Sequence, residues 1–375
     1  MNETLTTSHP LLILDPDVCR RNIRNMVRKA HAHQLIFRPH FKTHQSATIG
    51  GWFRDEGVSA ITVSSIAMAA YFIRHGWDDI TIALPLNPLA VREINAMAAR
   101  ARINLMIDQP EVLAATADLL TGSHDFWIKV DNGYGRAGIP STKTREILAF
   151  AGGIRRHPKH RFAGILIHQG DHYHCHGREA LMEAHRQNMI RLEPLARDLK
   201  RTFPGAVVSW GDTPSCSVAE DFGVVDEIRP GNFVFYDMMQ VAAGVCEPTD
   251  VAVTLAAPVL SVYPDDGKMI LHAGAVHLSK EIFSGTQEGW EGYGLLTRMH
   301  GFRRGESLPQ LKLLQLSQEH GVVTGPSEVI TTFRPGDLAG IIPVHSCLAA
   351  DLMKGYHTTT GERIPMMPAP SAYTD

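Results

Sequence analysis

The segment RPHFKTH contains a lysine, Lys42, that could act as a nucleophile. Arg38, His40 and His44 lie beside it in the sequence, and neighbouring cationic groups favour the neutral form of a lysine by lowering its pKa. A neutral amine can attack a carbonyl carbon and form a Schiff base. The segment therefore predicts a reactive lysine, although a surface lysine in a basic loop is the alternative for any lysine taken alone.

Two further segments offer a cation and possible acid–base groups. The segment KVDNGYGRAGI carries Arg136 after a Gly-containing turn, and its guanidinium could hold an oxygen or the ring of a cofactor. The segment HQGDHYH offers His168, His172 and Tyr173. Either histidine could serve as a catalytic base, and the alternative is a loop or core histidine whose hydrogen bonds are satisfied.

Two Gly-containing turns, WGDTPS at 210–215 and EIRPGNF at 227–233, follow the last two predicted strands of this part of the chain. Backbone N–H groups in such turns can bind a phosphate group. Near the C-terminus, PVHSC places His345 and Cys347 two residues apart. On an extended segment these side chains would point the same way and suit a divalent ion such as zinc, whereas a buried thiol beside a hydrogen-bonded histidine is the alternative.

Composition and charge indicate an ordinary globular protein. Apolar residues make up 44% and charged residues 20% of the 375 residues, and the net charge is −3. This charge leaves no basic surplus for nucleic acid, so we expect small-molecule ligands. The opening MNETLTTSHP does not resemble a secretory signal, no apolar stretch is long enough to cross a membrane, and the cysteine count of five is odd. These features predict a cytoplasmic protein with reduced thiols.

The pattern of elements predicts where these residues meet. An amphipathic helix is expected over 15–34, and short apolar runs alternate with helix-length segments up to about residue 240. About eight such units predict an α/β fold, a TIM-type (β/α)8 barrel over residues 16–240, with a mostly-β domain formed by residues 1–15 and 241–375. The strand at 10–15 is expected to pair with that β domain. In a barrel of this type the site lies at the C-terminal ends of the strands.

In this order, the six segments resemble those of the D-threonine aldolase and D-serine dehydratase family, which has the alanine-racemase-like fold of enzymes that use pyridoxal 5'-phosphate (PLP). RPHFKTH is similar to the family's lysine motif, KVDNGYGRAGI to K-V-D-x-G-x-x-R-x-G, and HQGDHYH to H-x-G-H-x-Y. GDTPS and EIRPGNFVFYD are similar to its phosphate-binding turns, and PVHSC to its metal pair. The segment HAGAVHLSKE departs from the family's common D-A-G-x-K-x-L-S form, and this leaves the choice of substrate open.

The resemblance implies a role for each candidate residue. It makes Lys42 the Schiff-base lysine, with His168 and His172 as candidate bases. The implied cofactor contacts are Arg136, Tyr173, Thr213, Gly231 and Asn232, of which the last three would bind the phosphate group. His345 and Cys347 become ligands of a divalent metal, zinc first, with manganese or magnesium as alternatives. The resemblance also implies a homodimer.

The implied activity is that of a lyase on D-3-hydroxy amino acids, by one of two reactions. A retro-aldol cleavage would give glycine and an aldehyde, and an elimination of water would give a keto acid and ammonia. The cysteine at position 347 favours the dehydratase. An amino-acid racemase is the main alternative, and a non-catalytic PLP carrier ranks lower because about 130 residues follow the predicted barrel.

Overall fold

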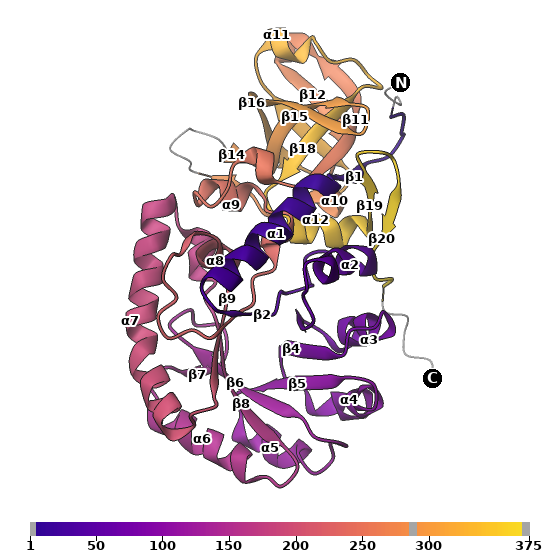
Figure 1. Cartoon of the computed structure of the whole chain (residues 1–375). Coiled ribbons are helices and arrows are strands. Elements are labelled where there is room, and N and C mark those ends of the chain that lie inside the picture. Colours follow the sequence, from indigo (N-terminus) through magenta and orange to yellow (C-terminus); the bar gives the residue numbers. More distant parts are fainter. Residues whose placement is uncertain (1–4, 285–290, 370–375) are drawn as a thin grey trace. The chain divides into compact units, whose positions relative to one another are not determined.

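The computed structural model describes residues 5–284 and 291–369, and the chain divides into two compact units (Figure 1). One unit takes in the chain up to Ile23 together with Asn232–Pro368, and the other takes in Arg24–Gly231. Helix α1 (Pro16–Ala32) therefore begins in the first unit and ends in the second. Among the described residues, no helix is both long and apolar enough to span a membrane.

The second unit is a barrel of eight parallel strands. An isolated parallel bridge between His40 and Thr62 joins the regions of its two edge strands, β2 and β3, and so closes the sheet. The strand order is β2-β10-β9-β8-β6-β5-β4-β3, which confirms the predicted TIM-type barrel. The strands are β2 (Ile36–Phe37), β3 (Ile61–Val63), β4 (Asp79–Pro85), β5 (Arg102–Ile107), β6 (Asp125–Asp131), β8 (Arg161–His168), β9 (Val207–Gly211) and β10 (Glu227–Ile228), with the short β7 (Ile139–Pro140) beside β6.

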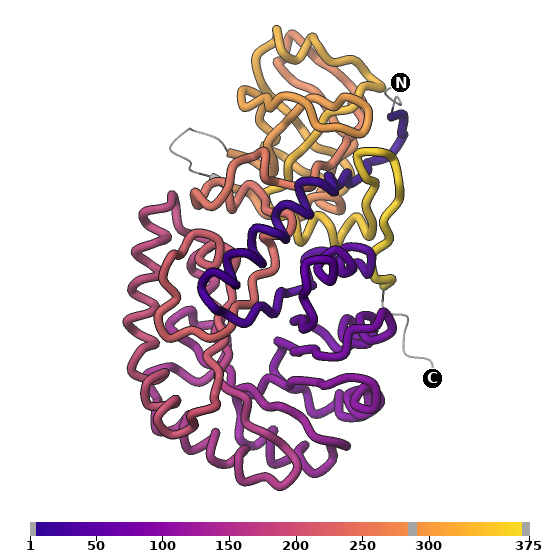
Figure 2. Tube along the Cα trace, in the orientation of Figure 1, coloured from indigo at the N-terminus to yellow at the C-terminus, as the bar shows by residue number. Residues whose placement is uncertain are grey.

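Helices surround these strands, as Figure 2 shows along the chain. The strands are apolar because both of their faces are covered: all residues of β6 except its last are buried. Strand β2 is shorter than the sequence predicts, since only Ile36 and Phe37 pair and Lys42 follows in a turn. The helices are α2 (Ala47–Asp55), α3 (Ile66–Arg74), α4 (Val91–Ala98), α5 (Pro110–Thr116), α6 (Thr144–Arg156), α7 (Arg178–Thr202) and α8 (Thr213–Val218).

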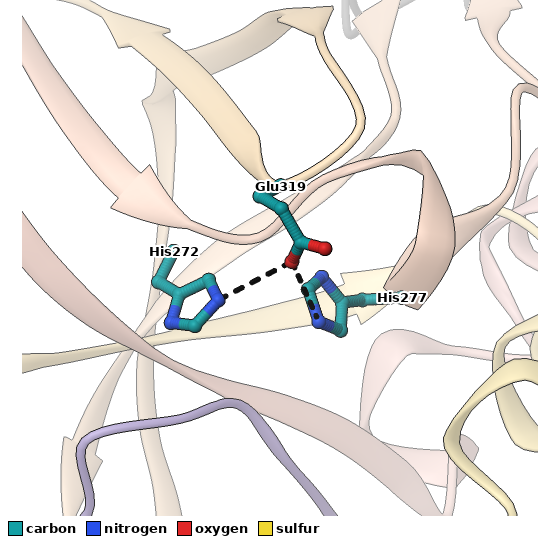
Figure 3. Close-up of side chains that lie close together, drawn as sticks. All are labelled: His272, His277 and Glu319. Atoms are coloured by element: carbon teal, nitrogen blue, oxygen red, sulfur yellow. Dashed lines mark hydrogen bonds and ion pairs between the residues drawn. The ribbon is translucent and has the colours of Figure 1, made fainter.

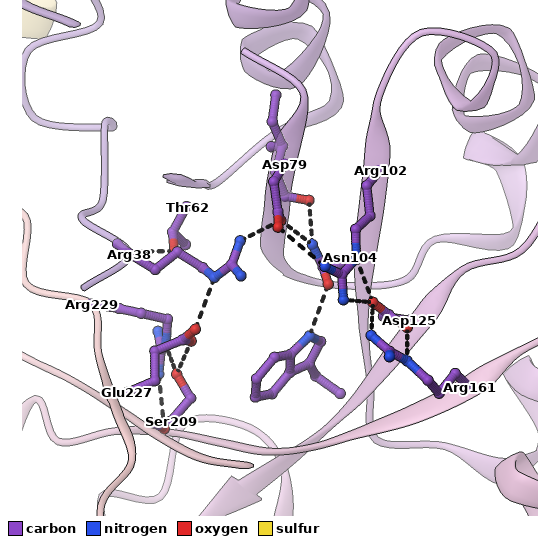
Figure 4. A network of polar contacts seen from close by, with 12 residues as sticks. Arg38, Thr62, Asp79, Arg102, Asn104, Asp125, Arg161, Ser209, Glu227 and Arg229 are labelled. Atoms are coloured by element: carbon purple, nitrogen blue, oxygen red, sulfur yellow. Dashed lines mark hydrogen bonds and ion pairs between the residues drawn. The ribbon is translucent and has the colours of Figure 1, made fainter. Parts of the chain in front are cut away.

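Ion pairs connect the N-terminal ends of several barrel strands (Figure 4). Arg38 donates to Glu227 at 2.9 Å and to Asp79 at 2.5 Å, at the starts of β10 and β4. Asp125, the first residue of β6, pairs with Arg161, the first residue of β8. Two carboxylates therefore compensate the charge of Arg38. Its guanidinium pairs with them in the barrel interior and does not lie beside Lys42, contrary to the sequence prediction.

The first unit is mostly β, as predicted. Six antiparallel strands, in the order β12-β17-β16-β15-β18-β11, form a closed barrel because β12 also pairs with β11. Strand β1 pairs antiparallel with β11, with Leu12 opposite Leu255, and parallel with β19. The opening strand thus joins the β domain as expected. These strands are β1 (Leu11–Leu14), β11 (Val253–Tyr263), β12 (Lys268–His272), β15 (Gly294–His300), β16 (Arg303–Leu316), β17 (His320–Thr324), β18 (Leu338–Pro343), β19 (Gly355–Thr358) and β20 (Arg363–Pro365).

Short helices connect the strands of this unit. Three of them matter below: α9 (Met238–Ala242), α10 (Ala275–Leu278) and α12 (Ser346–Met353). Helix α10 packs against α12, which begins directly after His345. The others are α11 (Ser327–Ile330) and, among the described residues of this unit, three 3-10 turns, and β13 (Phe283–Ser284) pairs antiparallel with β14 (Glu291–Gly292).

Candidate active site

Lys42 lies two residues beyond the bridge that closes the barrel, in an exposed position of the turn Phe41–His44. Its backbone N–H donates to Nδ1 of His40 at 3.3 Å. His44 lies on the other side of the turn, in a core of aromatic rings, 4.4 Å from Phe41 and 5.6 Å from Phe53 between ring centroids. Burial lowers the pKa of His44 to about 3. His44 therefore packs the turn as a neutral ring, and of the two nearby histidines only His40 is adjacent to Lys42.

Cationic groups converge on two histidines at this end of the barrel. Burial lowers the pKa of His40 well below its usual value, and the charges of Lys42 and Arg229 lower it further. Burial also lowers the pKa of His168 to about 3, with added effects of Arg136 and Lys42. Lys42 and Arg136 act on both rings, so these two cations and the two histidines lie in one region. Such a region attracts an anionic ligand.

Lys129 adds a further basic group to this cluster. It is buried in β6, where its Nζ donates to the carbonyl oxygen of Val130 at 2.6 Å. Burial lowers the pKa of Lys129 to about 7, and the charges of Arg229 and Arg136 act in the same direction. A lysine with this pKa changes its protonation near neutral pH, so the total charge of the cluster varies there.

His168 is the last residue of β8 and keeps one ring nitrogen available. Its Nδ1 lies 2.7 Å from the carbonyl oxygen of Gly211, which can only accept, so Nδ1 carries the proton. The neutral ring then presents an unprotonated Nε2. Among the described residues, no hydrogen bond to this Nε2 is seen, and the side chain is partly exposed. His168 can therefore accept a hydrogen bond or a proton from a ligand.

His172 is placed differently from His168. It is completely buried, with Nδ1 3.2 Å from Oδ2 of Asp212 and Nε2 3.0 Å from the side-chain nitrogen of Asn188. Although burial opposes it, Asp212 raises the pKa of His172. The next residue, Tyr173, accepts a hydrogen bond from the backbone N–H of Thr213 at 3.1 Å. The segment 168–174 thus holds the start of α8, and His172 has no surface on which to meet a substrate.

Arg136 follows β6 in a turn built by Asp131. The carboxylate of Asp131 accepts hydrogen bonds from the backbone N–H groups of Gly133 and Gly135, each at 3.0 Å. The guanidinium of Arg136 lies over the ring of Tyr134 at 5.5 Å, and that ring lies 5.8 Å from His168. The turn therefore carries Arg136 back to the strand ends where Lys42 and His168 lie.

The two predicted phosphate-binding turns contact each other. The hydroxyl oxygen of Thr213 accepts a hydrogen bond from the backbone N–H of Gly231 at 3.3 Å. A Cβ at position 231 would lie 2.9 Å from the carbonyl oxygen of His40, so only glycine fits there. Asn232 is used otherwise: its Nδ2 donates to Asp237 at 2.6 Å and to Cys347 at 3.5 Å.

His345 and Cys347 lie together in the β domain, but not on an extended segment. His345 is the N-cap of α12, and Cys347 lies in the first turn of that helix. A hydrogen bond to Cys347 and one to Glu281, whose Oε2 is 2.6 Å from Nδ1, raise the pKa of His345 to about 11 against the effect of burial. The buried Asp237 fixes this turn by accepting from the backbone N–H of Ser346 at 3.0 Å.

Comparison with known proteins agrees with this arrangement. The alanine racemase N-terminal domain model matches residues 14–238, and the serine dehydratase domain model matches residues 252–359. The chain belongs to the alanine racemase N-terminal domain family. This confirms the resemblance stated from the six sequence segments, together with the predicted fold.

Relatives of known name cover nearly the whole chain. D-threo-3-hydroxyaspartate dehydratase from Delftia sp. is 29% identical over 96% of this chain and 97% of its own. D-serine dehydratase from Dictyostelium discoideum is 28% identical over 94% and 93%. 3-Hydroxy-D-aspartate aldolase from Paracoccus denitrificans is 27% identical over 61% and 60%. A cysteine-to-alanine mutant of a D-threo-3-hydroxyaspartate dehydratase, solved in the metal-free form, superposes with a TM-score of 0.87 at 28% identity, covering 97% of this chain and 99% of its own.

Several functional residues escaped the sequence analysis. Arg229 lies inside EIRPGNF and Lys129 inside KVDNGYGRAGI, yet neither was singled out, although each lies in or directly after a barrel strand. Asp212 was seen only as part of a turn, and Glu281 was not considered as a partner of His345. A search for every charged residue at a predicted strand end would have found Arg229.

Proposed function

We propose that this alanine-racemase-family enzyme is a PLP- and metal-dependent lyase that removes water from a D-3-hydroxy amino acid. The observation that supports this most is the cationic cluster at the barrel strand ends, where Lys42 and Arg136 act on both His40 and His168, and Arg229 acts on His40. PLP carries a phosphate and an aldehyde, and an amino acid carries a carboxylate. A lysine suits the aldehyde, and several fixed cations suit the phosphate and the carboxylate.

The residues at the strand ends fit PLP. Lys42 is exposed and can react with the aldehyde. The turn formed by Thr213 and Gly231 has backbone N–H groups and no space for a side chain at position 231, which suits a phosphate group approaching the backbone closely. Arg136 is positioned to neutralise an oxygen of the ring. When bound, PLP draws electron density away from the substrate Cα.

The chain's own groups then have separate tasks. Nζ of Lys42 accepts the proton from Cα, and the arginines hold the anionic groups in place. The Nε2 of His168, unprotonated at neutral pH, can accept a hydrogen bond from the substrate's 3-hydroxyl group and so orient it. The hydroxyl group takes up the proton that Lys42 removed from Cα and leaves as water. The product enamine tautomerises to an imine, and hydrolysis of this imine gives a 2-keto acid and ammonia.

His345 and Cys347 are the proposed ligands of the divalent metal. An imidazole and a thiol suit zinc, and a site with few protein ligands leaves coordination positions for water or a substrate oxygen. A metal ion held by these two residues would supply Lewis-acid chemistry. The metal-free form of the dehydratase cysteine mutant supports the assignment of a cysteine to this role.

Dehydration is preferred over aldol cleavage on two grounds. The two full-length relatives described above are dehydratases, whereas the aldolase match covers 61% of the chain. The metal pair also contains cysteine at its second position, the residue that favoured dehydratase activity in the sequence analysis.

The purified protein, supplied with PLP, should be incubated with D-serine, D-threonine and D-3-hydroxyaspartate with and without a chelator. We expect keto acid and ammonia from at least one of them, loss of turnover with chelator and recovery with added zinc. Glycine plus an aldehyde would show an aldolase, racemised substrate alone a racemase, and no turnover a PLP carrier. Each of these results would overturn the proposal.

A second experiment tests the site residues. Borohydride reduction followed by mass spectrometry should leave PLP attached to a peptide containing Lys42, and Lys42→Ala should abolish the attachment. Lys143→Ala is the matched control, because Lys143 is an exposed lysine paired only with Glu146. Attachment that persists in Lys42→Ala would refute the assignment.

A further inference from the structure

The β domain contains a second group of possible metal ligands, away in sequence from His345 and Cys347. His272 ends β12, His277 lies on α10, and Glu319 lies just before β17 (Figure 3). Their candidate ligand atoms all lie within 4.8 Å of one another, and theirs is the only such group of three found in residues 5–284 and 291–369. We propose that these three residues bind a divalent transition-metal ion, zinc or a close analogue.

The spacing of the three groups suits ligands around an ion. Nε2 of His272 lies 3.4 Å from Oε2 of Glu319, at the long end of hydrogen-bond distances, and Nε2 of His277 lies 3.7 Å from the same oxygen. Two ligands that are each about 2.0 Å from a tetrahedral zinc ion lie about 3.3 Å apart. The three groups are therefore spaced as ligands around an ion.

Both rings point a nitrogen toward the same carboxylate oxygen of Glu319 (Figure 3). Nδ1 of His272 lies 3.4 Å from the carbonyl oxygen of Ser8, which favours a proton on Nδ1 and leaves Nε2 free to bind an ion. The side chains are 26%, 13% and 47% exposed for His272, His277 and Glu319, so an ion can reach the site from solvent.

His277 limits how tightly the ion is held. Its Nδ1 accepts a hydrogen bond from the backbone N–H of Gly274 at 3.0 Å, which places the ring proton on Nε2, facing Glu319. Metal binding at Nε2 must move this proton to Nδ1 and break the Gly274 contact, and this cost weakens the binding of the ion.

The chemical class follows from the ligands. Two imidazoles and one carboxylate suit zinc, cobalt or nickel better than calcium or magnesium, which prefer oxygen ligands only. Three protein ligands leave a fourth position for water or a small anion. Because His272, His277 and Glu319 come from three different elements, an ion there links the end of β12, α10 and the turn before β17.

The test counts metal in the full-length protein after loading with ZnCl2 and gel filtration. We expect Glu319→Gln and His272→Ala each to lower the bound zinc by about one ion per chain, and Cys347→Ala to leave that ion in place. His300→Ala is the matched control, since His300 and Glu306 also lie 3.4 Å apart but belong to no group of three possible metal ligands among the described residues. It should leave the zinc content unchanged.

Calorimetric titration of ZnCl2 into Cys347→Ala isolates the proposed site from the first pair. We expect one binding event whose apparent Kd rises at least tenfold in Cys347→Ala combined with Glu319→Gln, and also rises when the pH is lowered from 8 to 6. Equal zinc content and titration curves with and without Glu319→Gln would overturn the proposal. Neither measurement depends on catalytic activity. Failure of this proposal can therefore be told apart from failure of the proposed lyase function.

Discussion

Nδ1 of His172 lies 3.2 Å from Oδ2 of Asp212, and neither side chain is exposed to solvent. Asp212 also accepts hydrogen bonds from the backbone N–H and the hydroxyl of Ser215, at 2.7 and 2.8 Å. One carboxylate therefore joins the loop after β8 to the first turn of α8, which begins at Thr213. This relationship makes His172 a residue that positions the predicted phosphate-binding turn.

Removing Asp212 should destabilise the barrel strongly. In Asp212→Ala, His172 loses the partner of a buried pair, for which we expect a loss of about 3–5 kcal/mol in the free energy of unfolding. Urea denaturation measures it. The control is Asp221→Ala, because Asp221 is an exposed aspartate that caps a turn at Gly223. If both variants lose the same small amount of unfolding free energy, the His172–Asp212 pair contributes little to stability.

The coupling energy between His172 and Asp212 should depend on pH. The pKa of His172 is raised, so its contribution is complete below pH 6.5 and is lost as the pH rises through the raised value. Burial raises the pKa of Asp212, but His172 outweighs this effect and the pKa is lowered overall. The stabilisation that Asp212 contributes is therefore complete above pH 3.8 and is lost as the pH falls through the lowered pKa. A double-mutant cycle should give a plateau between these limits and a decline above pH 6.5, and a flat profile to pH 9 would contradict this.

His44 should make the protein sensitive to acid. Its pKa of about 3 lies below its usual value of 6.5, so the folded state resists protonation and stability falls as the pH drops from 6.5 to 3. The expected loss is about 1.4 kcal/mol per pH unit in that window. His44→Asn retains an acceptor for the Ser46 N–H, which lies 3.1 Å from Nδ1, and should reduce the slope. His31→Asn, at an exposed helix position, should leave it unchanged.

Arg38 should matter for stability and not for the chemistry at Lys42. Arg38→Met leaves the buried carboxylate of Glu227 without its guanidinium, and we expect a loss of about 3–5 kcal/mol in unfolding experiments. Arg197→Met removes an exposed pair with Glu193 and should cost less than about 1 kcal/mol. Similar losses of unfolding free energy in the two variants would show that the buried ion pairs of Arg38 stabilise the protein no more than an exposed pair does.

Gly231→Ala should weaken PLP binding while the fold is kept. The added Cβ would lie 2.9 Å from the carbonyl oxygen of His40 and 3.4 Å from the hydroxyl oxygen of Thr43, so the turn must shift. We expect at least a tenfold higher apparent Kd for PLP by fluorescence titration, with an unchanged circular dichroism spectrum. At Gly205 a Cβ meets nothing within 4 Å, so Gly205→Ala is the control. Unchanged affinity in Gly231→Ala would remove this turn from the proposed site.

The sequence by itself determined the architecture and most of the candidate site. Short apolar runs between amphipathic segments predicted the barrel, because strands buried on both faces need apolar side chains throughout. The positions of Lys42, Arg136 and His168 near strand ends predicted that they would converge, since parallel strands end at one face of a barrel. The pairing of β1 with the β domain also followed from its place before the first barrel helix.

Only the tertiary structure decided what each polar group contacts. His168 and His172 are four residues apart and equivalent in the sequence, yet one keeps a free ring nitrogen and the other is buried against Asp212. His272, His277 and Glu319 meet because β12 and β17 pair, with His272 opposite His320. Such contacts depend on side-chain direction and burial, which arise from packing between distant segments and are not encoded in local spacing.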